Sequence, residues 1–180
     1  MYYFLDLDEQ TRLNMISELE FDIRTGLFYE PSSMTASGMI SYKRLLKECF
    51  ENGTPETLQQ KLTSSFFREK DRNGRKIPSN IRETVAFCDF NRYYIRALLL
   101  RSLSEDKKLC VYRVKQVMNE RKESRLAVNK VYFDKKQIGQ MLSIFRDYRK
   151  LFAMKPQHEL LKPNSGLSLR LCQITLNSHL

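Results

Sequence analysis

The stretch 81-IRETVAFCDFNRYYIRALLLRSL-103 decides the fold of this 180-residue chain. Its apolar side chains would fall on most sides of an α-helix, which is typical of a helix at the centre of a fold. Ser79 or Asn80 stands directly before this pattern, and both residue types cap helix starts well. The sequence therefore predicts one long central helix from Ile81 to about Leu103.

Charged residues interrupt the apolar pattern of this helix. Asp89, Arg92 and Arg96 are spaced so that they share one helix face. Charges in such apolar surroundings must be paired or must line a pocket. We favour an internal ion-pair network that ties the helix to its neighbours, and we keep as an alternative an anion pocket in which Arg92 and Arg96 bind phosphate oxygens.

Two later stretches alternate between apolar and polar residues, which indicates strands. Leu109 to Gln116 has this alternation, and so does Leu167 to Cys172, where leucines occupy every second position. We expect these two strands to pair in antiparallel orientation. Residues 126–133 fit either a strand or a helix, and we favour a strand.

Helical spacing of apolar residues predicts further helices. They start at Asp8, near Tyr42, at Thr54 and at Asp134, and the last one continues to Phe152. The expected fold class is α+β and mostly helical: a helical N-terminal third, then the central long helix packed on a small antiparallel sheet. We divide the chain into an acidic helical subdomain (1–67), a basic linker (68–80) and a basic α+β subdomain (81–180), a division also compatible with one continuous domain.

The chain is basic, and its charge is unevenly distributed. Lys and Arg number 31 against 21 Asp and Glu, a net charge of +10. Residues 1–60 hold five basic and ten acidic side chains, whereas residues 61–180 hold 26 basic and 11 acidic ones. Such a field attracts polyanions, of which nucleic-acid backbones are the commonest. An anionic membrane or an acidic protein would use the same field, and a merely solubilising surface is the plain alternative.

We expect basic side chains of the second half to form one ridge that contacts phosphates. Arg113 and Lys115 would project from one face of their strand, and Arg170 would join them if the strands pair. The remaining members follow the first strand or begin the last long helix: Arg121, Lys122, Arg125, Lys130, Lys135 and Lys136. Tyr112 and Tyr132 are available for stacking on bases, although aromatic residues on strands more often pack in the core.

One pattern suggests catalysis. Metal-dependent nucleases combine an Asp with a Glu-x-Lys triplet, and Asp106 with Glu120 and Lys122 fits this loosely. The triplet falls after the strand rather than on it, so a nuclease is only a minor alternative.

Other catalytic and cofactor motifs are missing from the sequence. It has neither of the Gly-rich phosphate-binding patterns, and its two histidines, His158 and His179, lie in a loop pattern and next to the last residue. No Cys or His spacing for structural zinc is present. We expect no cofactor and no metal, and favour a protein that is not an enzyme.

The four cysteines, Cys49, Cys88, Cys110 and Cys172, occur singly among apolar neighbours. We interpret them as free, small hydrophobic residues, which indicates a reducing, intracellular compartment. No stretch is apolar enough to span a membrane, and no secretory signal is visible. We therefore expect a cytoplasmic protein without a membrane partner.

Three functions follow as hypotheses. The first is a small, non-catalytic nucleic-acid-binding protein, with DNA or RNA left open because no recognition motif decides between them. The second is a protein–protein interaction or assembly subunit, in which the acidic first third and the basic remainder contact other copies or partners. The third is the metal-dependent nuclease.

Overall fold

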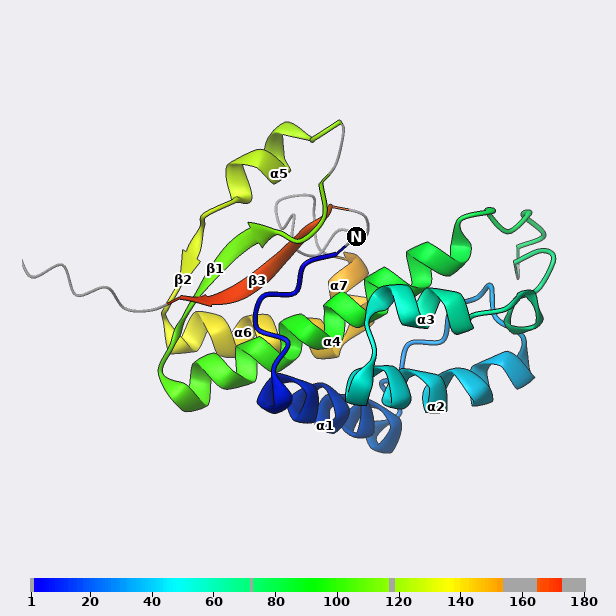
Figure 1. The fold of residues 1–180 in the computed structure, drawn as a ribbon, viewed down its shortest axis with the longest axis horizontal. Helices are drawn as coiled ribbons and strands as arrows, with labels where there is room; N and C mark the ends of the chain where they lie inside the picture. The colour runs from blue at the N-terminus through cyan, green and yellow to red at the C-terminus, as the bar shows by residue number, and fades with distance from the viewer. Residues whose placement is uncertain (1, 72, 117–118, 154–164, 173–180) are drawn as a thin grey trace, which may run out of the picture.

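The computed structural model describes residues 2–71, 73–116, 119–153 and 165–172, and His158 and His179 lie outside them. The fold is α+β and mostly helical, as predicted (Figure 1). The elements follow in the order α1 (Glu9–Thr25), α2 (Ala36–Asn52), α3 (Pro55–Lys61), the short 3-10 helix η1 (Ser64–Phe66), α4 (Ile81–Glu105), β1 (Lys108–Arg113), α5 (Lys122–Ala127), β2 (Val131–Tyr132), α6 (Lys135–Arg146), α7 (Tyr148–Ala153) and β3 (Leu167–Cys172).

Side-chain caps begin most of the longer helices. Asp8 and Asp134 accept backbone N–H bonds at the starts of α1 and α6, and Thr54 does so before Pro55 at the start of α3. These three starts were predicted. Asn80 occupies the capping position of α4, but its side chain makes no capping hydrogen bond.

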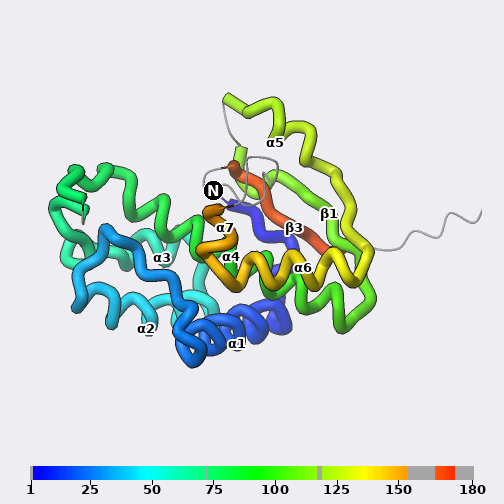
Figure 2. The backbone as a smooth tube through the Cα atoms, turned by 180° about the vertical axis from the view of Figure 1, so that it is seen from behind, coloured from blue at the N-terminus to red at the C-terminus, as the bar shows by residue number. Residues whose placement is uncertain are grey.

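The long helix α4 is the centre of the fold. Helices α1, α3 and α6 and the sheet all pack against it (Figures 1 and 2). Tyr93, Tyr94 and Leu98 are fully buried on different sides of this helix. One hydrophobic cluster includes Met15 of α1 and Leu169 of β3, so the acidic and the basic stretch of the sequence share a core.

The sheet has the strand order β2-β1-β3 and is antiparallel throughout. The predicted pairing of β1 with β3 is confirmed, with Val111 opposite Leu169. Leu109, Val111 and Leu169 are buried on the inner face of the sheet. By the alternation of a strand, Lys108 and Cys110 occupy the outer face, where Arg170 is exposed opposite Cys110.

Several predicted elements differ from the structure. Helix α2 starts at Ala36 rather than near Tyr42, because Thr35 caps it, and β1 ends at Arg113 rather than at Gln116. Residues 126–133 were expected as a strand, but the short helix α5 ends at Ala127 and only Val131–Tyr132 pairs with β1. The helix from Asp134 was expected to run unbroken to Phe152, but Asp147 is extended and its side chain accepts a hydrogen bond from the backbone of Arg149. Asp competes with helical hydrogen bonds in this way, so α7 starts anew.

The interpretation of all four cysteines as free is wrong for two of them. Cys110 of β1 and Cys172 of β3 form a disulfide, with a Cα–Cα distance of 6.0 Å. The two residues lie on one face of paired strands, two positions apart in register, which is within the reach of a disulfide. Cys49 is buried and Cys88 is half-buried. The cysteines therefore no longer support a reducing compartment.

The stretch predicted as a basic linker is tied to the first loop of the fold. The backbone N–H of Arg68 donates to Ser33, and its side chain donates to the carbonyl of Met34 at 2.8 Å. Asp71 accepts backbone hydrogen bonds from Asn73 and Arg75, which closes a turn. Residues 68–80, as far as they are described, thus follow a defined path rather than a loose connection.

Candidate functional site: the basic surface around α5 and β2

Arg96 binds α4 to α1 inside the protein. Its side chain is 0% exposed, and it donates to both carboxylate oxygens of Asp22 at 2.6 and 2.8 Å. Its Nε also donates to Glu18 at 2.7 Å, and Arg146 of α6 binds the same carboxylate. Burial alone would raise the pKa of Glu18, but the bonds from Arg146 and Arg96 outweigh burial and lower it. Arg96 is therefore held by internal ion pairs.

Arg92 is buried one turn away but is less well paired. Its Nη2 lies 4.0 Å from Asp22 and 3.9 Å from Asp89, both beyond hydrogen-bond distance. Its guanidinium lies over the ring of Tyr93, 4.9 Å from the centroid. Both arginines of the expected anion pocket lie 4.9 Å from the centre of the Tyr93 ring, but only Arg96 is hydrogen-bonded to carboxylates.

Arg113 and Lys115 are each paired with a carboxylate. Arg113 Nε lies 3.0 Å from Glu120, and its Nη1 donates to the carbonyl of Ser165 at 3.1 Å. Lys115 binds Glu83 and the hydroxyl of Tyr2, and these bonds raise the pKa of its ammonium group. Neither side chain is therefore a free phosphate contact.

The other predicted phosphate contacts differ from Arg113 and Lys115 in their exposure and pairing. Most are exposed without a carboxylate within 4 Å among the residues that the structure describes: Arg121, Lys122, Arg125, Lys130, Lys136 and Arg170. Lys135 is also exposed, but it pairs with Asp106 at 2.9 Å. Helix α5 carries Lys122 and Arg125 and follows Arg121, and it lies on the side of β1 and β2 away from α4 and α6 (Figures 1 and 2).

Arg121 and Arg125 meet at one place on this surface. Together with Asn119 and Glu120 they line an open hollow of about 480 Å³. Glu120 is already paired with Arg113, so its charge is shared with a third arginine. Two guanidinium groups beside an amide can hold a phosphate group through charge-assisted hydrogen bonds.

Apolar side chains are exposed on the same part of the chain. Leu126 of α5 is 75% exposed, and Phe133 directly after β2 is 69% exposed. The ammonium group of Lys108 lies 5.7 Å from the centre of the Phe133 ring. The expected stacking residues are placed differently: Tyr132 is buried, and the hydroxyl of Tyr112 is bonded to the backbone of Tyr3. An exposed aromatic ring beside a cation is suited to stacking on a base.

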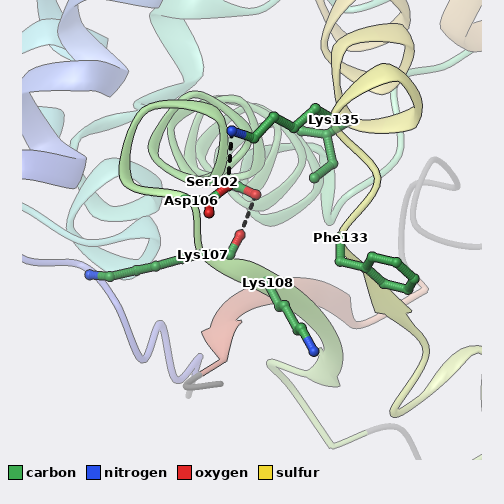
Figure 3. A pocket seen from close by; sticks show the side chains of 7 residues that line it. Ser102, Asp106, Lys107, Lys108, Phe133 and Lys135 are labelled. Atoms are coloured by element: carbon green, nitrogen blue, oxygen red, sulfur yellow. Dashed lines mark hydrogen bonds and ion pairs between the residues drawn. The ribbon is translucent and has the colours of Figure 1, made fainter. Parts of the chain in front are cut away.

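A smaller pocket of about 160 Å³ adjoins Phe133 where α4, β1 and α6 meet (Figure 3). Its lysines do not converge: Lys135 reaches back to Asp106, and Lys107 and Lys108 point to opposite sides (Figure 3). Lys108 was not among the predicted contacts, because the strand was expected to begin at Leu109. Its position two residues before Cys110, on the same strand face, was the signal that could have found it.

The residues proposed for a nuclease do not come together. Asp106 ends α4 before β1 begins, whereas Glu120 follows the far end of β1 and pairs with Arg113. Six strand residues span roughly 20 Å, far more than two carboxylates on one metal ion allow. Across the described residues, no cluster of three His, Cys, Asp or Glu side chains could hold a metal ion.

Comparison with known proteins assigns neither a family nor a function to this chain. None of the helices in the described part of the chain is both long and apolar enough to cross a membrane. No known protein family, no curated protein and no solved structure matches the chain.

Proposed function

We propose that this protein binds a nucleic acid without chemically altering it, and that the contact surface is formed by α5 and the neighbouring outer face of the sheet. Phosphates would contact Arg121, Lys122 and Arg125, and the ring of Phe133 would stack on a base. DNA and RNA both present phosphates and bases to such a surface, and the experiment below compares binding of the two.

The observation that carries this proposal is the contrast between two sets of surface cations. On α2 and α3, Lys43, Arg44, Lys47 and Lys61 each have a carboxylate within 4 Å. On α5, the cations have no such partner within the described residues. Residues 107–136 hold ten Lys and Arg but only three Asp and Glu. A local excess of unpaired cations attracts a polyanion and gains from the counterions it releases.

The assembly hypothesis receives less support from the same charges. Several acidic groups of the first sixty residues are neutralised within the molecule by arginines from the second half. Arg101 binds Asp8, and Arg96 and Arg146 bind Glu18. The unequal charge of the two stretches is therefore partly cancelled in the folded chain, which weakens a head-to-tail contact between copies.

The test is fluorescence anisotropy with labelled 20-nucleotide single-stranded DNA, single-stranded RNA and duplex DNA of mixed sequence at 50 and 200 mM KCl. If four phosphates are neutralised, we expect affinity to fall roughly 50-fold to 150-fold over this range. Absence of binding to all three at 50 mM KCl would overturn the proposal.

A matched pair of double variants locates the surface. Arg121→Gln/Arg125→Gln removes two unpaired cations, one directly before α5 and one on it, and we expect a weaker complex with a shallower salt dependence. Arg24→Gln/Arg44→Gln removes the same charge from exposed positions on α1 and α2 and should leave most of the affinity intact. An equal loss in both variants would show that net charge alone, and not this surface, drives binding.

A further inference from the structure

A cavity of about 310 Å³ lies beside the first half of α4, apart from the basic surface. One stripe of α4 forms its base, with Ile81, Val85 and Asp89 at helical spacing. Tyr29 and Phe152 form another wall, with their ring centres 5.5 Å apart. Its volume is at the lower end of the range for small-molecule sites, and its walls are mainly apolar, as in such sites.

Asp89 places a carboxylate in this apolar cavity. Tyr42 of α2 donates to its Oδ2 at 2.6 Å and fixes the orientation of the group. Its Oδ1 receives no hydrogen bond from any described residue, because Arg92 remains 3.9 Å away. Asp89 is only 6% exposed, and burial raises the pKa of its carboxyl group. This Oδ1 oxygen is not among the fully buried atoms without a partner, and Asp89 lines the cavity, so a donor that enters the cavity can reach it.

Arg92, next to Asp89, has a buried donor without a partner. Its side chain is more than nine-tenths buried, and its Nε has no hydrogen-bond partner. A buried polar atom without a partner is rare in folded proteins and calls for a ligand, an ion or a water molecule. Arg92 itself does not line the cavity, so the binding site is defined by the cavity and by the Asp89 oxygen that receives no hydrogen bond.

The charges around the site favour a neutral ligand. Acidic and basic side chains balance in the adjoining ion-pair cluster, which consists of Glu18, Asp22, Asp89, Arg92, Arg96 and Arg146. The other acidic residue that lines the cavity, Asp71, is only half-buried and accepts backbone hydrogen bonds within its own turn. A charged ligand would leave one charge in excess in a region of low dielectric constant, where such an excess is expensive.

We propose that this cavity binds a small neutral molecule with a flat, mainly apolar body and an N–H donor, of the aromatic amide class, whose N–H donates to Asp89 Oδ1. The flat body fits against Tyr29 and Phe152. This site does not depend on nucleic-acid binding, because it shares no residue with the surface of α5.

Three probes of nearly equal shape test the charge requirement: benzamide, which is neutral; benzamidine, which is a cation; and benzoate, which is an anion. Binding is followed by amide chemical shifts in ¹H–¹⁵N spectra of the full chain. We expect benzamide to bind saturably in the millimolar range, with shifts at residues that line the cavity, and the two charged probes to bind at least about 10-fold more weakly. Tighter binding of either charged probe, or no benzamide binding at about 10 mM, would overturn the proposal.

Two variants locate the site. Asp89→Asn keeps an acceptor for Tyr42 but turns an amide N–H₂ toward the ligand, so benzamide binding should fall at least about 10-fold. Ser32→Trp fills the exposed mouth of the cavity and should abolish binding even if Asp89→Asn fails to fold. Ser104→Trp, at an exposed position near the other end of α4, is the matched control and should bind benzamide like the wild type. Unchanged binding in Ser32→Trp contradicts this location.

Discussion

Arg96 and Asp22 form a two-pronged ion pair in which both side chains are fully buried, with N–O distances of 2.6 and 2.8 Å. Removal of one partner from such a pair leaves the other charge buried without compensation. For Arg96→Met we expect a loss of about 3–5 kcal/mol in the free energy of unfolding, measured by urea denaturation.

Arg44→Met serves as the control for that experiment. Arg44 is 80% exposed on α2, and its Nε lies 3.8 Å from Glu48. A solvated pair of this kind contributes about 1 kcal/mol or less, so the change in stability should be small. If both variants lose the same amount, the buried network does not stabilise the fold as described.

Lowering the pH should decrease the free energy of unfolding, because Glu18 becomes protonated. Its folded-state pKa is lowered below the ordinary value of 4.5, so its contribution to stability is complete above about pH 4.5 and is lost as the pH falls through the folded-state value. Glu18→Gln should therefore be much less stable than the wild type at pH 7, and the difference should shrink at pH 3. Urea denaturation at pH 7, 5 and 3 measures this, with Glu51→Gln, at an exposed position on α2, expected to follow the wild type. A constant difference at all three pH values contradicts the assignment.

Two glycines in helices should respond to alanine in opposite directions. A Cβ at Gly38 of α2 would lie 2.4 Å from the carbonyl oxygen of Phe66 and 2.9 Å from its Cα, both backbone atoms that cannot move aside. Gly38→Ala should cost about 1–3 kcal/mol. A Cβ at Gly139 of α6 meets nothing within 4 Å, so Gly139→Ala should gain about 0.5–1 kcal/mol through its helix propensity. Thermal unfolding of both variants tests the sign of each change.

The disulfide between Cys110 and Cys172 determines how many thiols can be alkylated before reduction. Alkylation of the unfolded, unreduced protein followed by mass spectrometry should modify two thiols, those of Cys49 and Cys88, and reduction should raise the number to four. Because the bridge closes a segment of 62 residues, Cys110→Ser/Cys172→Ser should lose roughly 4 kcal/mol by the chain-entropy estimate. Four modified thiols before reduction would show that the bridge is absent.

The sequence predicted the elements whose signal is periodic. The all-round apolar pattern of residues 81–103 and the alternation around Val111 and Leu169 led to the central helix and to the correct strand pairing. The disulfide was missed because its cysteines are 62 residues apart, and no local pattern joins them. Residues 126–133 were misread because a helix and a strand each occupy only part of that short segment.

The candidate site was predicted only in part, because ion pairing is decided by tertiary structure. Arg113 shares its strand face with Leu109 and Val111, so the alternation already indicated that this side chain points inward. The partner of Lys115 is Glu83, 32 residues earlier on α4, and no periodic signal connects the two. The exposed cations of α5 were identified from sequence because the local stretch contains few carboxylates that could neutralise them.

The ion pairs of Glu18 determine when α1 can complete its packing during translation. Its two arginine partners are translated 78 and 128 residues later, so a ribosome needs about 4–16 seconds after Glu18 to supply even the first of them. Until then α1 carries carboxylates that cannot enter an apolar interior without compensation. A nascent chain that stops before α4 is therefore unable to complete the packing of its first helix, and folding of the N-terminal third must wait for the middle of the polypeptide.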